Sequence, residues 1–197
     1  MSRRARKLTL KARAERQEET RRRITEAAVA LHESVGPARA SVSAIARKAG
    51  VQRLTFYRHF PDMGALFQAC SAHYMATHPL PDLSDWLATA DPEERLNRAL
   101  TGLYRYYRGT AAMNQNIFRD AAVMPELAKL MDGYRGFIAM MADLLAEGLR
   151  PSASHRLLKA ALAHALDFET WLSLTSKSGL SDEEAVRLMS GMVKCAR

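Results

Sequence analysis

The chain has 197 residues, of which 48% are hydrophobic and 25% are charged, and this balance excludes wholesale disorder because it provides enough apolar material for a core. The net charge is +8, and the excess lies at the front: residues 1–60 carry a net charge of +10 and the remainder carries −2. A basic front joined to a near-neutral body favours a module that binds a polyanion, whereas a merely solubilising surface does not explain the asymmetry.

Residues 1–16 (MSRRARKLTLKARAER) are basic and lack a sustained apolar stripe. Such a segment cannot bury enough surface to offset the entropy lost on ordering, so we predict a flexible basic N-terminal arm. When DNA is present, we expect this arm to lie on phosphates or enter a minor groove. The alternative is a disordered tail with no role.

A helical pattern begins at about Gln17 and ends at Gly36-Pro37. Its buried face is formed by apolar residues at three- and four-residue steps, namely Ile24, Ala27, Ala28, Leu31 and Val35. Ser41 is typical of an N-cap and predicts a second, short helix over SVSAIARKAG.

Gly50 provides the positive φ that a tight turn between helices needs, and it precedes a third short helix over QRLTFYRHF. Residues 60–62 (Phe-Pro-Asp) end this helix and open a fourth, which runs to about His78. We therefore assign residues 17–78 to a helix-turn-helix DNA-binding domain with a linking fourth helix.

The residue pattern also predicts helices over residues 79–197, and we assign this part to a helical domain for effector binding and dimerisation. Proline or capping side chains predict helix starts at Asp91-Pro92, Pro125, Pro151-Ser152 and Ser181. The predicted segments are 91–109, 114–122, 125–148, 151–176 and 181–195. No segment alternates as a strand does, so the predicted fold class is all-α.

Three short helices with an Ala-Gly-Val turn between the second and the third form a helix-turn-helix, which offers its third helix to the major groove. In that helix Phe56 and Phe60 can hold the domain together, while the polar residues point elsewhere. Arg and Gln suit guanine and adenine edges, Thr suits thymine or phosphate, and Tyr and His suit phosphates. The candidate DNA-binding residues are Ser41, Ser43, Gln52, Arg53, Thr55, Tyr57, Arg58 and His59.

The run SVSAIARKAGVQRLTFYRHFPDMGALF resembles the DNA-binding segment of the tetracycline-repressor (TetR) family of bacterial regulators, and the resemblance covers about Gln17 to His73. It implies a homodimeric repressor of palindromic operator DNA, released when a small molecule binds the C-terminal domain. It assigns DNA contacts to the candidate residues above other than Gln52. Met63 departs from the family pattern, where a phosphate-contacting lysine is usual, and Leu54 departs where glycine or proline is frequent.

Methionine and aromatic residues with a few polar tips suit an apolar pocket for an effector of unknown identity. The candidate pocket residues are Tyr104, Tyr107, Phe118, Met140, Leu144, His164, Phe168 and Trp171. Packing in the core is the alternative for each of them. His164 either bonds the effector or is a core histidine satisfied by Asp167 or a main-chain carbonyl, and the second interpretation is slightly favoured.

The last two predicted helices are expected to form a four-helix interface with a second copy, because one recognition helix reads too few base pairs for useful specificity. The candidate interface residues are Leu158, Leu162, Leu166, Leu172, Leu188, Met189 and Met192.

We expect no enzyme activity, no cofactor and no metal site. The chain has no HExxH, P-loop or GxGxxG motif, and Cys70, His73 and His78 lack a fourth ligand at recognisable spacing. We expect a cytoplasmic protein without a membrane partner. The two cysteines lie far apart, no apolar run is long enough for a bilayer, and the sequence shows no signal peptide. A nonspecific architectural DNA binder, a helical enzyme with a DNA-binding segment, and activation in place of repression remain as alternatives.

Overall fold

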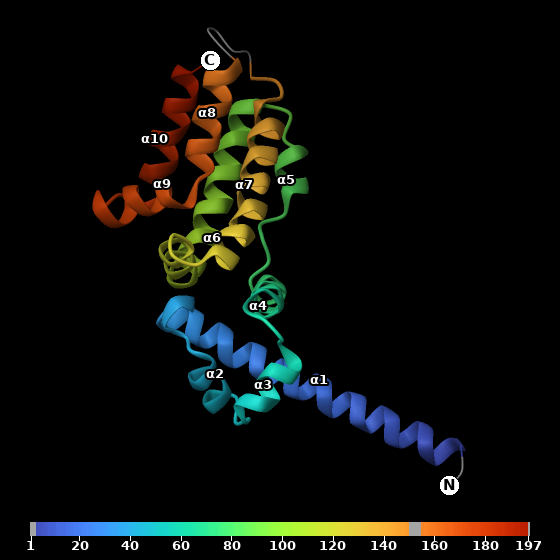
Figure 1. Cartoon of the computed structure of the whole chain (residues 1–197). Coiled ribbons are helices and arrows are strands. Elements are labelled where there is room, and N and C mark those ends of the chain that lie inside the picture. Colours follow the sequence, from blue (N-terminus) through green and yellow to red (C-terminus); the bar gives the residue numbers. More distant parts are fainter. Residues whose placement is uncertain (1–2, 150–154, 197) are drawn as a thin grey trace. The chain divides into compact units, whose positions relative to one another are not determined.

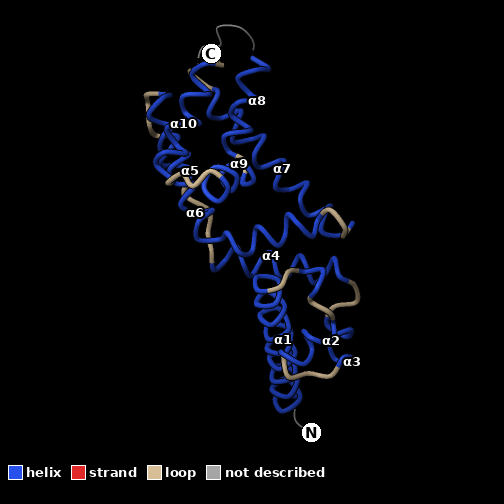
Figure 2. The backbone as a smooth tube through the Cα atoms, turned by 90° about the vertical axis from the view of Figure 1, so that its left-hand side faces the viewer, coloured by secondary structure: helices blue, strands red, loops and turns tan. Residues whose placement is uncertain are grey.

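The computed structural model describes residues 3–149 and 155–196, and across these ranges the chain contains helices and no strand (Figures 1 and 2). Its α-helices are α1 (Arg3–Ser34), α2 (Val42–Lys48), α3 (Arg53–His59), α4 (Met63–Thr77), α5 (Leu83–Leu87), α6 (Pro92–Ala121), α7 (Pro125–Ala146), α8 (His155–Leu166), α9 (Phe168–Leu172) and α10 (Asp182–Cys195). The all-α prediction is confirmed. In the part of the chain that the structure describes, no helix combines the length and apolar character needed to cross a membrane.

The chain divides into two compact units, and α6 contributes to both. The first unit comprises the chain up to residue 78 together with residues 115–130, and the second comprises residues 79–114 and 131–197. In the first unit α1 packs against α2 and α4, and α2 packs against α3. Its core combines five larger apolar side chains with alanines and a cysteine: Ile24, Ala27, Ala28, Ala40, Ile45, Ala46, Ala49, Phe56, Phe60, Leu66 and Cys70.

The first helix begins at Arg3, so the structure corrects the predicted start near Gln17 and places residues 3–16, expected as a flexible arm, in a helix. Nothing in this segment stops a helix: it holds no proline or glycine and is rich in Arg, Ala, Lys and Leu, which all favour helix. Once the packed part of α1 has formed, adding further turns carries no nucleation cost.

The end of α6 caps the end of α1 within the first unit. The Asn116 amide donates to the main-chain carbonyls of His32 and Glu33 at 3.0 and 2.7 Å, which are among the carbonyls that a helix end leaves unpaired. The Asp120 carboxylate accepts from Ala38 N at 2.9 Å. Between these contacts the chain turns at Gly36, whose φ of 94° favours glycine.

The structure also corrects the predicted break after Gly109, because α6 runs through it without interruption. A glycine inside a helix costs only about 1 kcal/mol relative to alanine, so favourable neighbours outweigh it. Thr110 Oγ1 donates to Tyr106 O at 2.8 Å, and Asn114 Nδ2 donates to Thr110 Oγ1 at 3.0 Å along this stretch. The expected helix over residues 114–122 is therefore the end of α6.

The long helix predicted for residues 151–176 is wrong in the described residues, because α8 ends at Leu166 and α9 starts at Phe168. Asp167 N-caps α9 by accepting from Glu169 N at 2.7 Å. The freed carbonyls of Ala165 and Leu166 accept hydrogen bonds from the hydroxyls of Tyr104 and Tyr107 at 2.8 and 2.6 Å. The predicted start at Pro151-Ser152 lies outside the described residues.

The remaining boundaries follow local signals. Ser181 caps α10 in a capping box with Glu184, as the sequence predicts. The short α5 was not predicted; Asp82 caps it by accepting from Ser84 N at 2.9 Å, and its Trp86 is buried.

Candidate nucleic-acid interface

Local signals build the helix-turn-helix from α2, a glycine turn and α3. Ser41 caps α2 by accepting from Ala44 N at 3.2 Å. Gly50 has a φ of 65°, and the following Val51 N donates to Ala46 O at 2.9 Å, so the turn closes tightly. The predicted Ser41 cap and glycine turn are confirmed.

The faces of α3 separate core from surface. Phe56 and Phe60 are 1% and 0% exposed and anchor the helix to the unit. Thr55 and His59 are half-buried at the edge of this anchor. The other polar candidates of the helix-turn-helix are exposed: Ser41, Ser43, Gln52, Arg53, Tyr57 and Arg58. The structure thus gathers all eight candidate residues on α2, α3 and their starts.

The charge of this surface comes from arginine, since His59 is held mainly neutral. Partial burial first, and then the neighbouring Arg58 and Arg21, lower the pKa of His59 below its ordinary value. A neutral imidazole can still donate one hydrogen bond to a phosphate oxygen.

Two arginines of α1 hold the ends of the bihelical unit, a role that the sequence pattern does not indicate. Arg21 Nη1 donates to His59 O at 2.8 Å, at the last turn of α3, and its guanidinium carbon lies 4.3 Å from the centre of the Phe60 ring. Arg23 Nη2 donates to the main-chain oxygen of Ala49 at the end of α2. Helix ends leave carbonyls unpaired, so these contacts stabilise both helices and fix their placement on α1.

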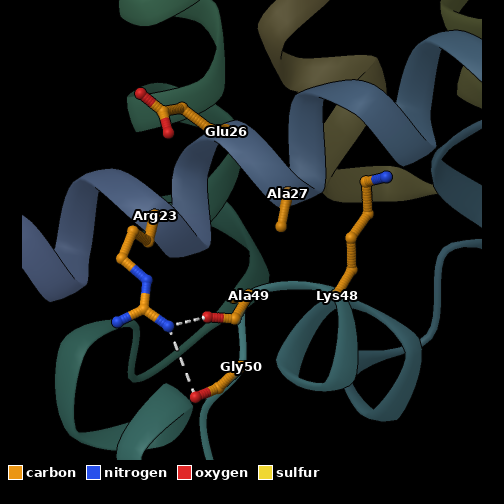
Figure 3. Close-up of a pocket in the computed structure, with 6 residues that line it drawn as sticks. All are labelled: Arg23, Glu26, Ala27, Lys48, Ala49 and Gly50. Atoms are coloured by element: carbon orange, nitrogen blue, oxygen red, sulfur yellow. Dashed lines mark hydrogen bonds between the residues drawn. The ribbon is translucent and has the colours of Figure 1, made fainter.

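The Arg23 contact also forms one wall of a cavity of about 410 Å³ between α1 and the end of α2. Figure 3 shows the guanidinium reaching the carbonyls of Ala49 and Gly50, the second at 3.4 Å. Its lining residues are Arg23, Glu26, Ala27, Lys48, Ala49 and Gly50. The depression thus lies beside the contact of Arg23 Nη2 that holds the turn to α1.

The sequence of this same segment matches a known family. Residues 24–70 match the model of the bacterial regulatory proteins of the tetR family. The segment that holds the helix-turn-helix is thus similar to the N-terminal DNA-binding segment of this family. A search of curated protein sequences gives no match.

Solved structures resemble the chain over about nine-tenths of its length. A transcriptional regulator from Rhodococcus sp. Rha1 is 20% identical with a TM-score of 0.66, over 88% of this chain and 95% of that one. NalD of Pseudomonas aeruginosa, the secondary repressor of an efflux pump, is 23% identical with a TM-score of 0.63, over 89% and 96%. A proposed regulator from Saccharomonospora viridis, solved with choline, is 21% identical with a TM-score of 0.62, over 90% and 96%. At these identities the matches establish a shared fold.

The candidate pocket residues separate into two groups. Four aromatics pack together: the ring centre of Tyr107 lies 5.3 Å from that of Phe168 and 6.0 Å from that of Trp171, and Tyr104 stacks beside it at 6.4 Å. All four are at most 3% exposed. They fill the space between α6 and α9 themselves, so a ligand entering there has to displace rings.

The other candidates do not join this cluster. Met140 is 46% exposed, Leu144 and Phe118 are half-buried, and Phe118 belongs to the first unit. His164 is exposed, and its Nδ1 lies 3.2 Å from Thr170 Oγ1. The favoured interpretation of His164 as a core histidine bonded to Asp167 or a carbonyl is therefore wrong, because α8 buries Leu158, Leu162 and Leu166 and leaves His164 exposed.

The candidate interface residues also divide. Leu158, Leu162 and Leu166 are fully buried and Met189 is 6% exposed within one chain, so these four are core and offer almost no surface to a second copy. Leu172 and Met192 are half-buried and Leu188 is 49% exposed, so the interface stays a prediction for these three. The spacing of apolar residues on a helix does not distinguish a side chain buried within one chain from one that contacts a second copy.

Within the described residues no group of three or more His, Cys, Asp or Glu side chains is arranged to hold a metal ion. Cys70 is buried beside Thr25 O, and burial raises the pKa of its thiol to about 12. His78 stacks on Tyr74 with ring centres 4.1 Å apart.

Proposed function

We propose that this chain is a regulator of transcription, a homodimeric repressor that binds a palindromic operator through α3 and is released by a small molecule bound to residues 79–197. Its partners are thus operator DNA, a second copy and an effector of unknown identity, and it acts in the cytoplasm, where the DNA lies. No step in this proposal requires catalysis or a cofactor.

The observation that carries the proposal is the outward face of α3. Arg53, Tyr57 and Arg58 are exposed there, while Arg21 and Arg23 hold the helix ends from α1. A helix that enters the major groove needs donors for base edges and a placement rigid enough to set their register. Arg53, at the first turn, is suited to guanine, and Ser41, Ser43, Tyr57 and His59 are suited to phosphates.

The proposed dimer and the proposed ligand-dependent repression are supported by different observations. A dimer doubles the base pairs that are read, and Leu172, Leu188 and Met192 keep apolar surface for it. Repression is supported by likeness in fold to NalD, and ligand binding by likeness to the regulator solved with choline. For the candidate pocket we propose that a ligand parts the packed Tyr107, Phe168 and Trp171 rings.

The deciding experiment measures binding of the full chain to the intergenic DNA beside its own gene, with unrelated DNA as competitor at physiological salt. A sharp, two-fold symmetric footprint that survives competition supports a sequence-specific repressor and provides the probe for an effector screen. Diffuse binding that salt abolishes would instead favour an architectural DNA binder, because contacts to phosphates alone are the most sensitive to salt.

A further inference from the structure

The most exposed apolar side chain of the helix-turn-helix lies on its recognition helix. Leu54 is 79% exposed, although burying a leucine is worth about 1.5–3 kcal/mol. It is the second residue of α3, directly after Arg53. The N-terminal residues of a recognition helix are those that reach base edges.

The geometry of α3 places Leu54 on the side away from the protein. Leu54 and Arg58 are one turn apart and share a face, and both are exposed. Phe56 and Phe60 are buried on the other side of the helix. Whatever α3 meets with this face therefore meets Leu54 between two guanidinium groups, those of Arg53 and Arg58.

This combination selects one kind of partner. Two arginines favour a polyanion, and an aliphatic group between them needs an apolar feature on that polyanion. In the major groove the only such feature on a base edge is the C5-methyl group of thymine. A second protein surface fits less well, because the flanking arginines would be desolvated without a carboxylate to pair with.

We propose that Leu54 is a specificity-determining residue, which selects thymine by packing its side chain against the C5-methyl group in the major groove. The proposal rests on the proposed function, namely sequence-specific binding through α3. The contact is apolar, so it adds selectivity for one base without adding a charge–phosphate contact.

The test replaces thymine by uracil, which removes only the methyl group. A preferred duplex is first selected from a random library with the full chain, and each dT is then changed singly to dU. The wild-type chain is expected to lose about fourfold in affinity at one thymine of each half-site, the worth of about one methylene. Leu54→Ala should bind dT and dU equally at that position, whereas Leu54→Met, which stays aliphatic, should keep a preference for dT.

The matched control is Val123→Ala, which shortens another exposed aliphatic side chain, 72% exposed, in the turn after α6. Its dU profile should equal that of the wild type. The proposal is overturned when no thymine shows a dU penalty, or when Leu54→Ala keeps the full wild-type penalty at every thymine. A library that yields no preferred sequence overturns the proposed function itself, so the two failures are distinguishable.

Discussion

Arg21 of α1 donates a hydrogen bond to the main-chain oxygen of His59, the last residue of α3, across 38 positions of sequence. The neighbouring Arg22 instead pairs with Glu19 and Glu26 on its own helix. These adjacent arginines thus make different contacts: Arg21 bonds the end of α3, and Arg22 lies on a solvent-exposed face of α1.

Arg21→Ala is expected to weaken binding to the selected duplex by on the order of tenfold, since a hydrogen bond to a charged group contributes about 1.5–3 kcal/mol. Arg22→Ala removes the same charge without touching α3 and should cost far less. Titrations at one salt concentration measure both. Equal losses in the two variants would mean that Arg21 contributes only its charge.

The basic start of α1 is expected to contact DNA phosphates. Deleting residues 2–11 removes five Lys and Arg residues, so affinity should fall and log Kd should depend less steeply on log salt concentration. Binding isotherms between about 50 and 200 mM salt measure this slope. A deletion variant with the wild-type slope would show that the segment makes no phosphate contact.

Stability should depend on pH through His32, which is 2% exposed and packs near Phe67. Burial lowers the pKa of His32 to about 4, against a smaller opposing effect of Asp120. Between pH 6.5 and about 4 the unfolded chain therefore binds the proton more tightly than the folded one. The free energy of unfolding that neutral His32 contributes is fully present above pH 6.5. It falls by about 3 kcal/mol in all as the pH falls through this window.

Denaturant unfolding at several pH values tests this dependence. His32→Leu should remove most of the loss between pH 6.5 and 4.5, while His155→Leu, at an exposed residue, should leave it in place. An unchanged pH dependence in His32→Leu would assign the acid sensitivity to other groups.

Gly36 is expected to resist substitution. A Cβ atom there would lie 2.1 Å from Arg119 Nη2 and 2.5 Å from Asp120 Oδ2, in addition to the strain of its φ of 94°. Gly36→Ala should cost about 1–3 kcal/mol of unfolding free energy. Gly109→Ala is the control, because nothing lies within 4 Å of its Cβ position inside α6, and it should stabilise by about 0.5–1 kcal/mol. An unchanged free energy of unfolding in Gly36→Ala would show that Arg119 and Asp120 of α6 move aside at little cost.

Tyr107 is expected to hold the break between α8 and α9. Its hydroxyl donates to Leu166 O at 2.6 Å, and burial raises the pKa of Tyr107, so it stays a donor at every ordinary pH. Tyr107→Phe leaves a buried carbonyl unpaired and should cost about 1–3 kcal/mol in thermal or denaturant unfolding. Tyr106→Phe removes the same oxygen from a half-buried neighbour and should cost less; equal costs would argue against a special role for the Leu166 contact.

The helix-turn-helix was predictable from sequence because the interactions that define it are local. The Ser41 cap reaches three residues, the Gly50 turn needs only its own φ, and the apolar spacing that buries Phe56 repeats within one helix. The capping box at Ser181 is equally local, and it was predicted for the same reason. These signals also carried the family resemblance, so the proposed regulatory role could be inferred from the residues alone.

Tertiary structure decided what depends on partners distant in sequence. Arg21 and Arg22 are the same residue type, and only the position of α3 in the folded chain lets Arg21 bond the carbonyl of His59. Leu158 and Leu188 have the same apolar side chain, yet one is core and the other is exposed. At the break before Asp167, the hydroxyls of Tyr104 and Tyr107, about 60 residues earlier, donate to the carbonyls of Ala165 and Leu166 that the break frees. Local patterns determine that a helix forms and which face is apolar, while packing against the rest of the chain determines what that face meets.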